Sequence, residues 1–403
     1  MSIKEEQLKY AKVILGAGVA LQKGQLVELN CPVDLADFAA ILTEEALKQG
    51  AKDVYVTYTD PRVKIARYKY CEKETLVNPP EFYLNIKQHF IDNRAAMINL
   101  YHVHGDEYSA VDPKLVVEEG AAFKRLLHPA NRFMFRNQCT FGMIMVPDQE
   151  WADLVFPNEE NNLEKLWKYV GIACRTHLPD PVGSWMEHYR LSNEHAQKIQ
   201  ECKFRTLRYK NGLGTDFTVG IRPEMEWGGG GSIKFGDKIF FPNMPTEEIG
   251  TTPDRLTANG ILYASRPLNA NGQLIEDFWV RFQDGRVVDY DAKKGLDSLR
   301  AIIEHDEGSH YLGEVALVAA DSPIASLHTT FYNTLFDENA SCHFAFGNAY
   351  DGSKRSEEEL LAAGINLSEI HVDFMVGTED LDIVGIDENG KETYIFKNGT
   401  WAI

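Results

Sequence analysis

The chain gathers residue types that bind divalent metals into one short stretch, residues 337–373. Carboxylate oxygens and imidazole nitrogens are the ligands that zinc, cobalt and manganese take from proteins. The stretch offers two of each kind, which are Glu338, His343, His371 and Asp373. A metal site in the C-terminal half is therefore the first hypothesis.

His371 and Asp373 are separated by one apolar residue within the apolar run 370–376. If this run is a strand, both side chains project from the same face. The pair is weak evidence by itself, because a half-buried strand often alternates with its polar face in water. The same spacing recurs in the His-Val-His sequence of residues 102–104.

Acidic residues at two upstream positions strengthen the hypothesis. Glu314 interrupts a run, 311–318, that otherwise predicts a buried strand, where a carboxylate is costly unless a cation pairs with it. The alternative is a strand end at which Glu314 reaches water. Glu247 and Glu248 follow a predicted strand over 238–241, in a loop position common for catalytic groups. For that pair taken alone, an exposed acidic turn is the favoured interpretation.

Four motifs occur in one order and spacing: Asn-Met-Pro-Thr-Glu-Glu at 243–248, Gly-Glu-Val-Ala-Leu-Val at 313–318, Glu-Asn-Ala-Ser-Cys-His with Ala-Phe-Gly-Asn-Ala-Tyr at 338–350, and His-Val-Asp-Phe-Met-Val-Gly at 371–377. Together they resemble the aminopeptidase T and aminopeptidase S family, bacterial metallopeptidases with a dinuclear metal centre. The similarity is densest in the C-terminal half and extends along nearly the whole chain. The chain departs from the family pattern at Phe344, at Phe346 and in a shorter linker after Tyr350.

The resemblance implies that six side chains hold two divalent metal ions, with Glu314 as the bridging carboxylate and Tyr350 as a further catalytic residue. In the family's spacing Glu248 is favoured over Glu247. The implied ligands are Glu248, Glu314, Glu338, His343, His371 and Asp373.

Physical chemistry explains the use of such a set. The four carboxylates carry about four negative charges, which two divalent cations would neutralise. Two metals activate a shared water near neutral pH and polarise the scissile carbonyl. Tyr350 could donate a hydrogen bond to the oxyanion, although an ordinary half-buried tyrosine is the alternative. Glu247 is a candidate partner for the α-ammonium group of the substrate.

Composition sets the outer limits. A chain of 403 residues is long enough for two domains, and a net charge of −19 argues against nucleic acid and anionic membranes as partners. Six widely spaced cysteines predict free thiols in a reducing compartment. The N-terminus lacks a signal-peptide pattern, and no run of about 18 apolar residues occurs. We therefore expect a cytoplasmic protein.

The order of predicted elements indicates two fold classes. Residues 1–200 alternate strands and helices, which predicts an α/β domain with a parallel sheet covered on both faces. Residues 201–403 predict an α+β, mostly antiparallel catalytic domain that carries every proposed ligand; residues 228–231 are expected to form a loop. The first domain is expected to shape a cleft or to form a dimer, and the resemblance implies a homodimer. The predicted strands are 26–29, 54–57, 96–101, 141–146, 204–209, 216–221, 238–241, 261–265, 381–386 and 393–397, with a hairpin over 274–290; the predicted helices are 34–49, 80–93, 114–127, 163–174, 184–202 and 296–304.

The predicted function is a metal-dependent aminopeptidase of broad specificity that acts on peptides with a free N-terminus. A glycoside hydrolase also uses paired carboxylates, but it does not need His343 and His371. A dinuclear phosphoesterase would usually add Arg or Lys for phosphate, and neither adjoins the ligand motifs. A non-enzymatic metal-binding protein fits poorly with Tyr350 and with ligands spread over about 125 residues. The sequence leaves open whether zinc, cobalt or manganese is the natural metal.

Overall fold

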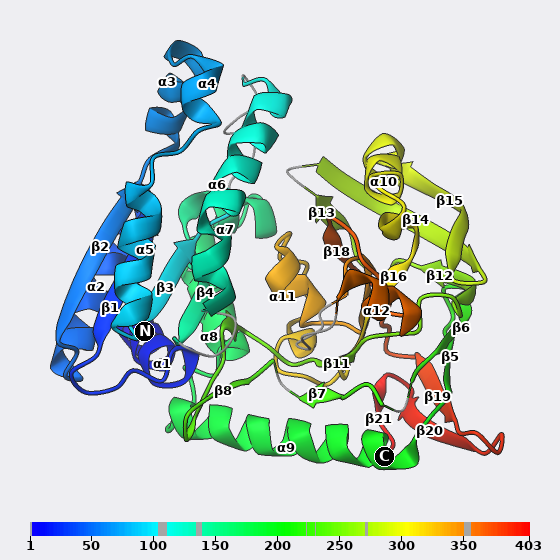
Figure 1. The fold of residues 1–403 in the computed structure, drawn as a ribbon. Coiled ribbons are helices and arrows are strands. Elements are labelled where there is room, and N and C mark those ends of the chain that lie inside the picture. The colour runs from blue at the N-terminus through cyan, green and yellow to red at the C-terminus, as the bar shows by residue number, and fades with distance from the viewer. Residues whose placement is uncertain are drawn as a thin grey trace. The chain divides into compact units, whose positions relative to one another are not determined.

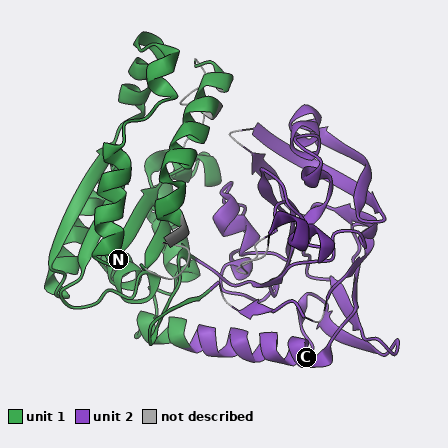
Figure 2. Cartoon of the chain, viewed as in Figure 1, with its two compact units in different colours: residues 1–186, 232–244 green, residues 187–231, 245–403 purple. Residues whose placement is uncertain are grey.

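The computed structural model describes residues 2–103, 111–133, 139–222, 224–229, 231–270, 273–349 and 356–403. The predicted catalytic residue Tyr350 lies outside this part of the chain. The chain divides into two compact units (Figure 2): unit 1 is Met1–Met186 with Ser232–Met244, and unit 2 is Glu187–Gly231 with Pro245–Ile403. Relative to the predicted boundary near residue 200, residues 187–200 therefore fall in unit 2 and Ser232–Met244 in unit 1.

Unit 1 is built on a five-stranded sheet in the order β10-β4-β3-β1-β2. All neighbouring strands are parallel, which confirms the predicted fold class of the N-terminal part. The sequence did not predict β10, whose two residues join this sheet from far along the chain. The strands are β1 (Leu26–Pro32), β2 (Asp53–Thr59), β3 (Ala96–Tyr101), β4 (Phe141–Met145) and β10 (Asn243–Met244), with the separate hairpin β8 (Ile233–Phe235) and β9 (Lys238–Phe240).

Helices cover both faces of this sheet (Figure 1). On one face, Lys87 of α5 donates a hydrogen bond of 3.0 Å to the buried Glu28 of β1. On the other face lies α2, which places Phe38 and Leu42 in the core. The helices are α1 (Ile3–Val13), α2 (Ala36–Lys48), α3 (Pro61–Tyr70), α4 (Lys73–Leu76), α5 (Phe82–Asp92), α6 (Pro113–Phe133), α7 (Gln149–Val155), α8 (Asn162–Ala173) and α9 (Pro181–Cys202), whose residues belong to both units. In the described part of the chain no helix is long and apolar enough to cross a membrane.

Unit 2 contains two antiparallel sheets, as predicted for an α+β C-terminal part. The smaller sheet has the order β18-β17-β16-β11-β7, and the larger has nine strands. The prediction of a loop at 228–231 was wrong in part, because Gly228 and Gly229 form a short strand that pairs with β11. The smaller sheet consists of β7 (Gly228–Gly229), β11 (Ile249–Thr251), β16 (Leu312–Leu317), β17 (His343–Gly347) and β18 (His371–Met375).

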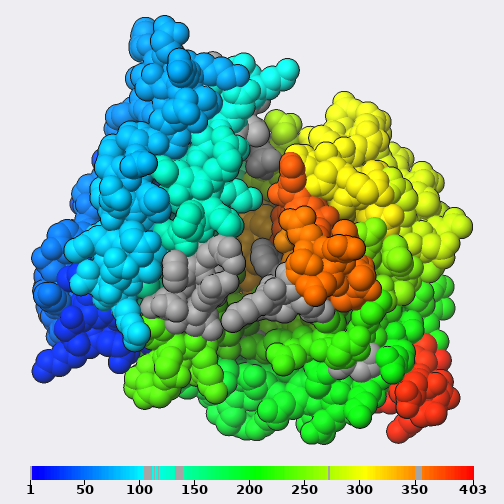
Figure 3. Space-filling model, in the orientation of Figure 1, coloured from blue at the N-terminus to red at the C-terminus, as the bar shows by residue number. Residues whose placement is uncertain are grey.

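The larger sheet, three further helices and the second part of α9 complete the described part of unit 2. The hairpin β14–β15 turns at Asp284 and Gly285, which both have positive φ, as the Asp-Gly pair predicted. Helix α12 begins with a capping box between Ser356 and Glu359. The helix lies at the surface (Figure 3), and its acidic residues Glu357, Glu358 and Glu359 are exposed. The elements are β5 (Thr206–Lys210), β6 (Asp216–Gly220), β12 (Asn259–Tyr263), β13 (Leu268–Ala270), β14 (Gln273–Gln283), β15 (Arg286–Lys294), β19 (Asp382–Ile386), β20 (Glu392–Lys397), β21 (Thr400–Trp401), α10 (Leu296–Ile303), α11 (Thr334–Glu338) and α12 (Glu357–Ala362).

Candidate metal centre

The smaller sheet of unit 2 brings together residues that are far apart in the sequence. Ala345 in the middle of β17 pairs with Glu314 of β16 on one side and with Asp373 of β18 on the other. Cross-strand partners project from the same face, and so do residues two apart along a strand. His343 and His371 therefore lie on the same face as the two carboxylates.

The opposite face of the same strands is apolar. Phe344 and Phe346 alternate with His343, Ala345 and Gly347 along β17, Phe374 follows Asp373 in β18, and all three rings are buried in the core of unit 2. The rings of Phe346 and Phe374 stack with their centroids 4.3 Å apart. The two phenylalanines by which β17 departs from the family pattern thus serve packing, and their burial fixes the register that aligns the polar face.

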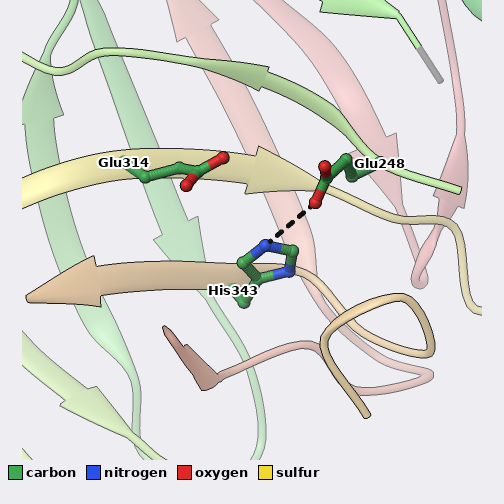
Figure 4. Close-up of side chains that lie close together, drawn as sticks. All are labelled: Glu248, Glu314 and His343. Carbon is green, nitrogen blue, oxygen red and sulfur yellow. Dashed lines mark ion pairs between the residues drawn. The ribbon is translucent and has the colours of Figure 1, made fainter. Parts of the chain in front are cut away.

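A first group of possible ligands consists of Glu248, Glu314 and His343 (Figure 4). Each offers one ligand atom, and these atoms lie within 4.8 Å of one another. Glu248 precedes β11, and its Oε2 lies 3.3 Å from His343 Nε2. The His343 side chain is only 1% exposed, so this contact is shielded from bulk water.

A second group consists of Glu314, His371 and Asp373. His371 Nε2 lies 3.1 Å from Glu314 Oε2 and 3.3 Å from Asp373 Oδ1. Glu314 belongs to both groups, so its carboxylate is the element that the two possible cation positions share.

Backbone carbonyls orient both histidines. His343 Nδ1 donates to the carbonyl oxygen of Ser341 at 3.0 Å, and His371 Nδ1 donates to that of Asn348 at 2.7 Å. Because a carbonyl only accepts, Nδ1 carries the proton in each ring. Nε2 is thereby directed at the carboxylates, which is the arrangement that metal-binding histidines usually have.

Glu338 approaches the same cluster from the C-terminal end of α11. Asn333 caps this short helix by accepting from the Phe336 amide at 3.3 Å, and the Asp337 carboxylate accepts from the Phe331 amide at 2.8 Å. Burial raises the pKa of Glu338 well above its usual range, and the charges of Asp373 and Glu248 raise it further. Glu338 is therefore electrostatically part of the acidic cluster.

The cluster carries an excess of negative charge, because four carboxylates face two histidines. Burial raises the pKa of Glu314, and the negative charges of Glu248 and Asp373 raise it further. A hydrogen bond from His371 lowers this pKa, but it does not cancel the increase. Burial alone would lower the pKa of His343, but its hydrogen bond with Glu248 and the surrounding carboxylates raise it to about 10. Burial likewise opposes ionisation of Asp373, yet the two histidines outweigh it and lower its pKa.

The fixed cations of the protein do not supply the missing charge. Among the described residues, the ion pairs of Glu248, Glu314 and Asp373 are all with histidines rather than with Lys or Arg. Buried carboxylates need a positive partner. Converging carboxylate oxygens and imidazole Nε2 atoms are a donor set that suits divalent cations such as zinc, so the residues fit the group that the sequence predicted.

The two adjacent glutamates, Glu247 and Glu248, have different interaction partners. Glu248 faces His343, whereas Glu247 Oε2 lies 3.7 Å from Nδ1 of His188 on α9. The Glu247 side chain is 5% exposed. This geometry supports Glu248 over Glu247 as a ligand. His188 could not be identified from the sequence, because an isolated histidine within a helix has no spacing pattern that marks it.

A further group, His305, Asp306 and Glu369, lies at the surface of unit 2. The Asp306 carboxylate accepts from the amides of Ser309 and Glu369 and from the Ser368 hydroxyl, at 2.6 to 2.9 Å. These bonds join two loops, so we interpret this group as structural.

Comparison with known proteins agrees with the geometry. The family model described as thermophilic metalloprotease (M29) matches residues 3–401. Aminopeptidase AmpS of Bacillus subtilis is 36% identical over 408 residues, which cover 100% of this chain and 99% of that protein. Aminopeptidase T of Thermus thermophilus is 34% identical over 411 residues, with 100% of both chains covered.

Solved structures show the same likeness in three dimensions. The structure of wild-type AmpT from Thermus thermophilus matches with a TM-score of 0.91 and 32% identity, and the match covers 100% of both chains. A dioxygenase from Pseudomonas putida matches with a TM-score of 0.52 at 12% identity, which is a likeness of fold alone.

Proposed function

This chain belongs to the thermophilic metalloprotease family M29, and we propose that it is an aminopeptidase that cleaves the first peptide bond of its substrates with two bound divalent cations. The observation that carries the proposal is the position of Glu314. Its carboxylate belongs to both groups of converging ligand atoms, as a bridge between two cations requires.

Six side chains would hold the cations. Glu248 and His343 would serve one position, His371 and Asp373 the other, and Glu314 both. Glu338 would complete the set, since its carboxylate is coupled by charge to Asp373 and Glu248. When bound, such cations supply a water that is deprotonated near neutral pH and polarise the scissile carbonyl.

The protein's own groups would orient and shield this chemistry. The carbonyls of Ser341 and Asn348 keep both imidazoles in the tautomer that presents Nε2. We propose Tyr350 as a hydrogen-bond donor to the oxyanion, a role supported by the family resemblance. Glu247 is buried beside His188, so we assign recognition of the substrate's α-amine to the acidic centre itself rather than to Glu247.

Peptides with a free N-terminus are the proposed substrates, with broad preference at the first residue. The absence of Lys and Arg among the described ion partners of Glu248, Glu314 and Asp373 favours a peptide over a phosphoester. We propose zinc, cobalt or manganese as the metal. Free cysteines agree with a cytoplasmic location, and the resemblance supports a homodimer, to which the N-terminal domain would contribute by dimerisation or by shaping a cleft.

Hydrolysis of aminoacyl chromogenic substrates tests the proposal. Activity should be lost with a chelator and restored by zinc, cobalt or manganese, and it should be confined to substrates with a free α-amine. The matched control is the same substrate with its amine acetylated. Absence of activity with every metal, or equal cleavage of the acetylated substrate, would reject the proposal.

A further inference from the structure

We propose that Asn339 is a positioning residue of the metal centre, because its side-chain amide ties the segment that carries Glu248 to the helix end that carries Glu338. The inference rests on the proposed function. It adds a residue that is not among the proposed ligands and that nothing in the ligand pattern identifies.

Both polar atoms of the Asn339 side-chain amide form hydrogen bonds. Its Oδ1 accepts from the backbone N–H of Glu247 at 2.7 Å, and its Nδ2 donates to the carbonyl of Leu335 at 2.8 Å. Nδ2 also lies 3.4 Å from Glu338 Oε1. Asn339 is 1% exposed, so these bonds are made in a dry environment, where an unsatisfied polar group is costly.

The hydrogen bond between Asn339 and the Glu247 amide joins residues that are 92 positions apart in the sequence. It helps to position Glu248, the first of the two ligands concerned. The N–H that Asn339 holds belongs to the residue immediately before Glu248, whose side chain reaches His343 at 3.3 Å. Fixing the Glu247 amide therefore limits where the Glu248 carboxylate can lie. Only a side chain with a donor and an acceptor can hold this amide and a helix carbonyl together.

The hydrogen bonds from Asn339 to α11 help to position Glu338, the second of the two ligands. Leu335 lies in a helix of five residues, whose last carbonyls have no partner within the helix. Asn339 satisfies one of them and places a donor beside the Glu338 carboxylate.

Loss of this bridge should loosen Glu248 and Glu338 together while leaving all six ligands present. Changes to such supporting residues typically reduce metal affinity or activity by about 10- to 100-fold. We therefore expect Asn339→Ala to weaken Co²⁺ binding by at least about tenfold and to alter the visible absorption of the Co²⁺-loaded protein, which reports ligand geometry.

Asn162→Ala is the matched control. Asn162 is also a buried asparagine that bridges side chains, since its Nδ2 donates to Asp153 Oδ1 at 2.7 Å and its Oδ1 accepts from Gln149 Nε2 at 2.9 Å. It lies in unit 1 and contacts none of the proposed ligands. We expect this variant to lose thermal stability but to keep the wild-type Co²⁺ affinity and spectrum.

The experiment titrates Co²⁺ into the metal-free full chain and records affinity, visible absorption and melting temperature. Wild-type binding and spectrum in Asn339→Ala would overturn the inference; failure of the wild-type protein to bind Co²⁺ would instead reject the proposed function. If Asn339→Ala does not fold, Asn339→Asp takes its place, because it keeps an acceptor for the Glu247 N–H but cannot donate to Glu338. An altered spectrum would support the inference in that variant, and an unchanged spectrum would overturn it.

Discussion

Gly250 leaves the space that the Glu314 carboxylate occupies: a Cβ on Gly250 would lie 3.1 Å from Glu314 Oε1. Gly250→Ala should displace this shared carboxylate by a few tenths of an ångström and weaken metal binding about tenfold. Gly250 does not have a positive φ, so the metal-free protein should keep its stability. The measurements are Co²⁺ affinity and the melting temperature of the metal-free chain.

Gly228→Ala is the control for this substitution. Gly228 pairs with Gly250 in the same sheet, but the nearest atom to its Cβ would be 4.0 Å away. Unchanged metal affinity in both variants would contradict the importance of the space beside Glu314.

Glu314→Gln should abolish turnover and weaken metal binding at the same time, because both groups of ligand atoms lose their common carboxylate. We expect kcat to fall by at least about 100-fold. The metal-free variant should be no less stable than the wild type, since the ionised Glu314 is disfavoured by burial and by neighbouring carboxylates. The test compares the wild type with Glu314→Gln, each after metal removal by a chelator and after metal loading. The melting temperature and the steady-state kinetics are measured for each sample. A variant that is stabilised by metal as strongly as the wild type would contradict the prediction.

Metal binding should release protons and strengthen as pH rises. Its hydrogen bond with Glu248 and the surrounding carboxylates raise the pKa of His343 to about 10, against a burial effect that lowers it, so at neutral pH the metal must displace a proton from this ring. Calorimetric titration near pH 8 in two buffers with different heats of ionisation measures the released protons. Binding heats that do not depend on the buffer would rule out protonated His343 in the metal-free state.

The same pKa predicts how the metal-free protein responds to pH. The pKa of His343 is raised from 6.5 to about 10, so its stabilising effect is complete below pH 6.5 and is lost as pH rises toward 10. Thermal melts of the chelated protein across this range should show falling stability. His343→Gln should reduce the slope, and an equal slope in both proteins would contradict the assignment.

Thiol reactivity should distinguish the six cysteines. Cys71 is exposed, and Cys202 is partly buried. Burial raises the pKa of Cys31 and Cys139 to about 11 and that of Cys342 to about 12, which leaves little reactive thiolate. Labelling with a chromogenic disulfide at pH 8 should show one fast thiol in the native protein, and Cys71→Ser should remove it. A fast phase that persists in Cys71→Ser would contradict the predicted exposure.

Much of the fold could be predicted because its longer elements carry their own patterns. The strand predicted over 96–101 matches β3 to the residue, and the Asp284–Gly285 turn has the two positive φ angles that its sequence predicts. Strands β7 and β10 could not be predicted, since two residues are too few for a period. Neighbouring strands create them by offering hydrogen-bond partners.

The candidate site could be proposed from the sequence only as far as ligand types and family motifs mark it, because residue spacing alone also marks residues outside it. His102 has the same spacing pattern as His371, but His102 Nδ1 contacts Asp148 Oδ2 at 2.9 Å in unit 1 and belongs to no group of possible ligands among the described residues. The contacts of Glu247 with His188 and Asn339 join distant segments, so they became visible only in three dimensions.

Strand β17 should not tolerate a change in its length. Phe344 and Phe346 alternate along it with His343, Ala345 and Gly347, so deletion of one residue between its ends would turn a phenylalanine toward the face of the proposed ligands and His343 into the core of unit 2. Such a deletion should therefore destabilise unit 2 as well as remove activity. Insertions and deletions should be tolerated in the surrounding loops long before they are tolerated here.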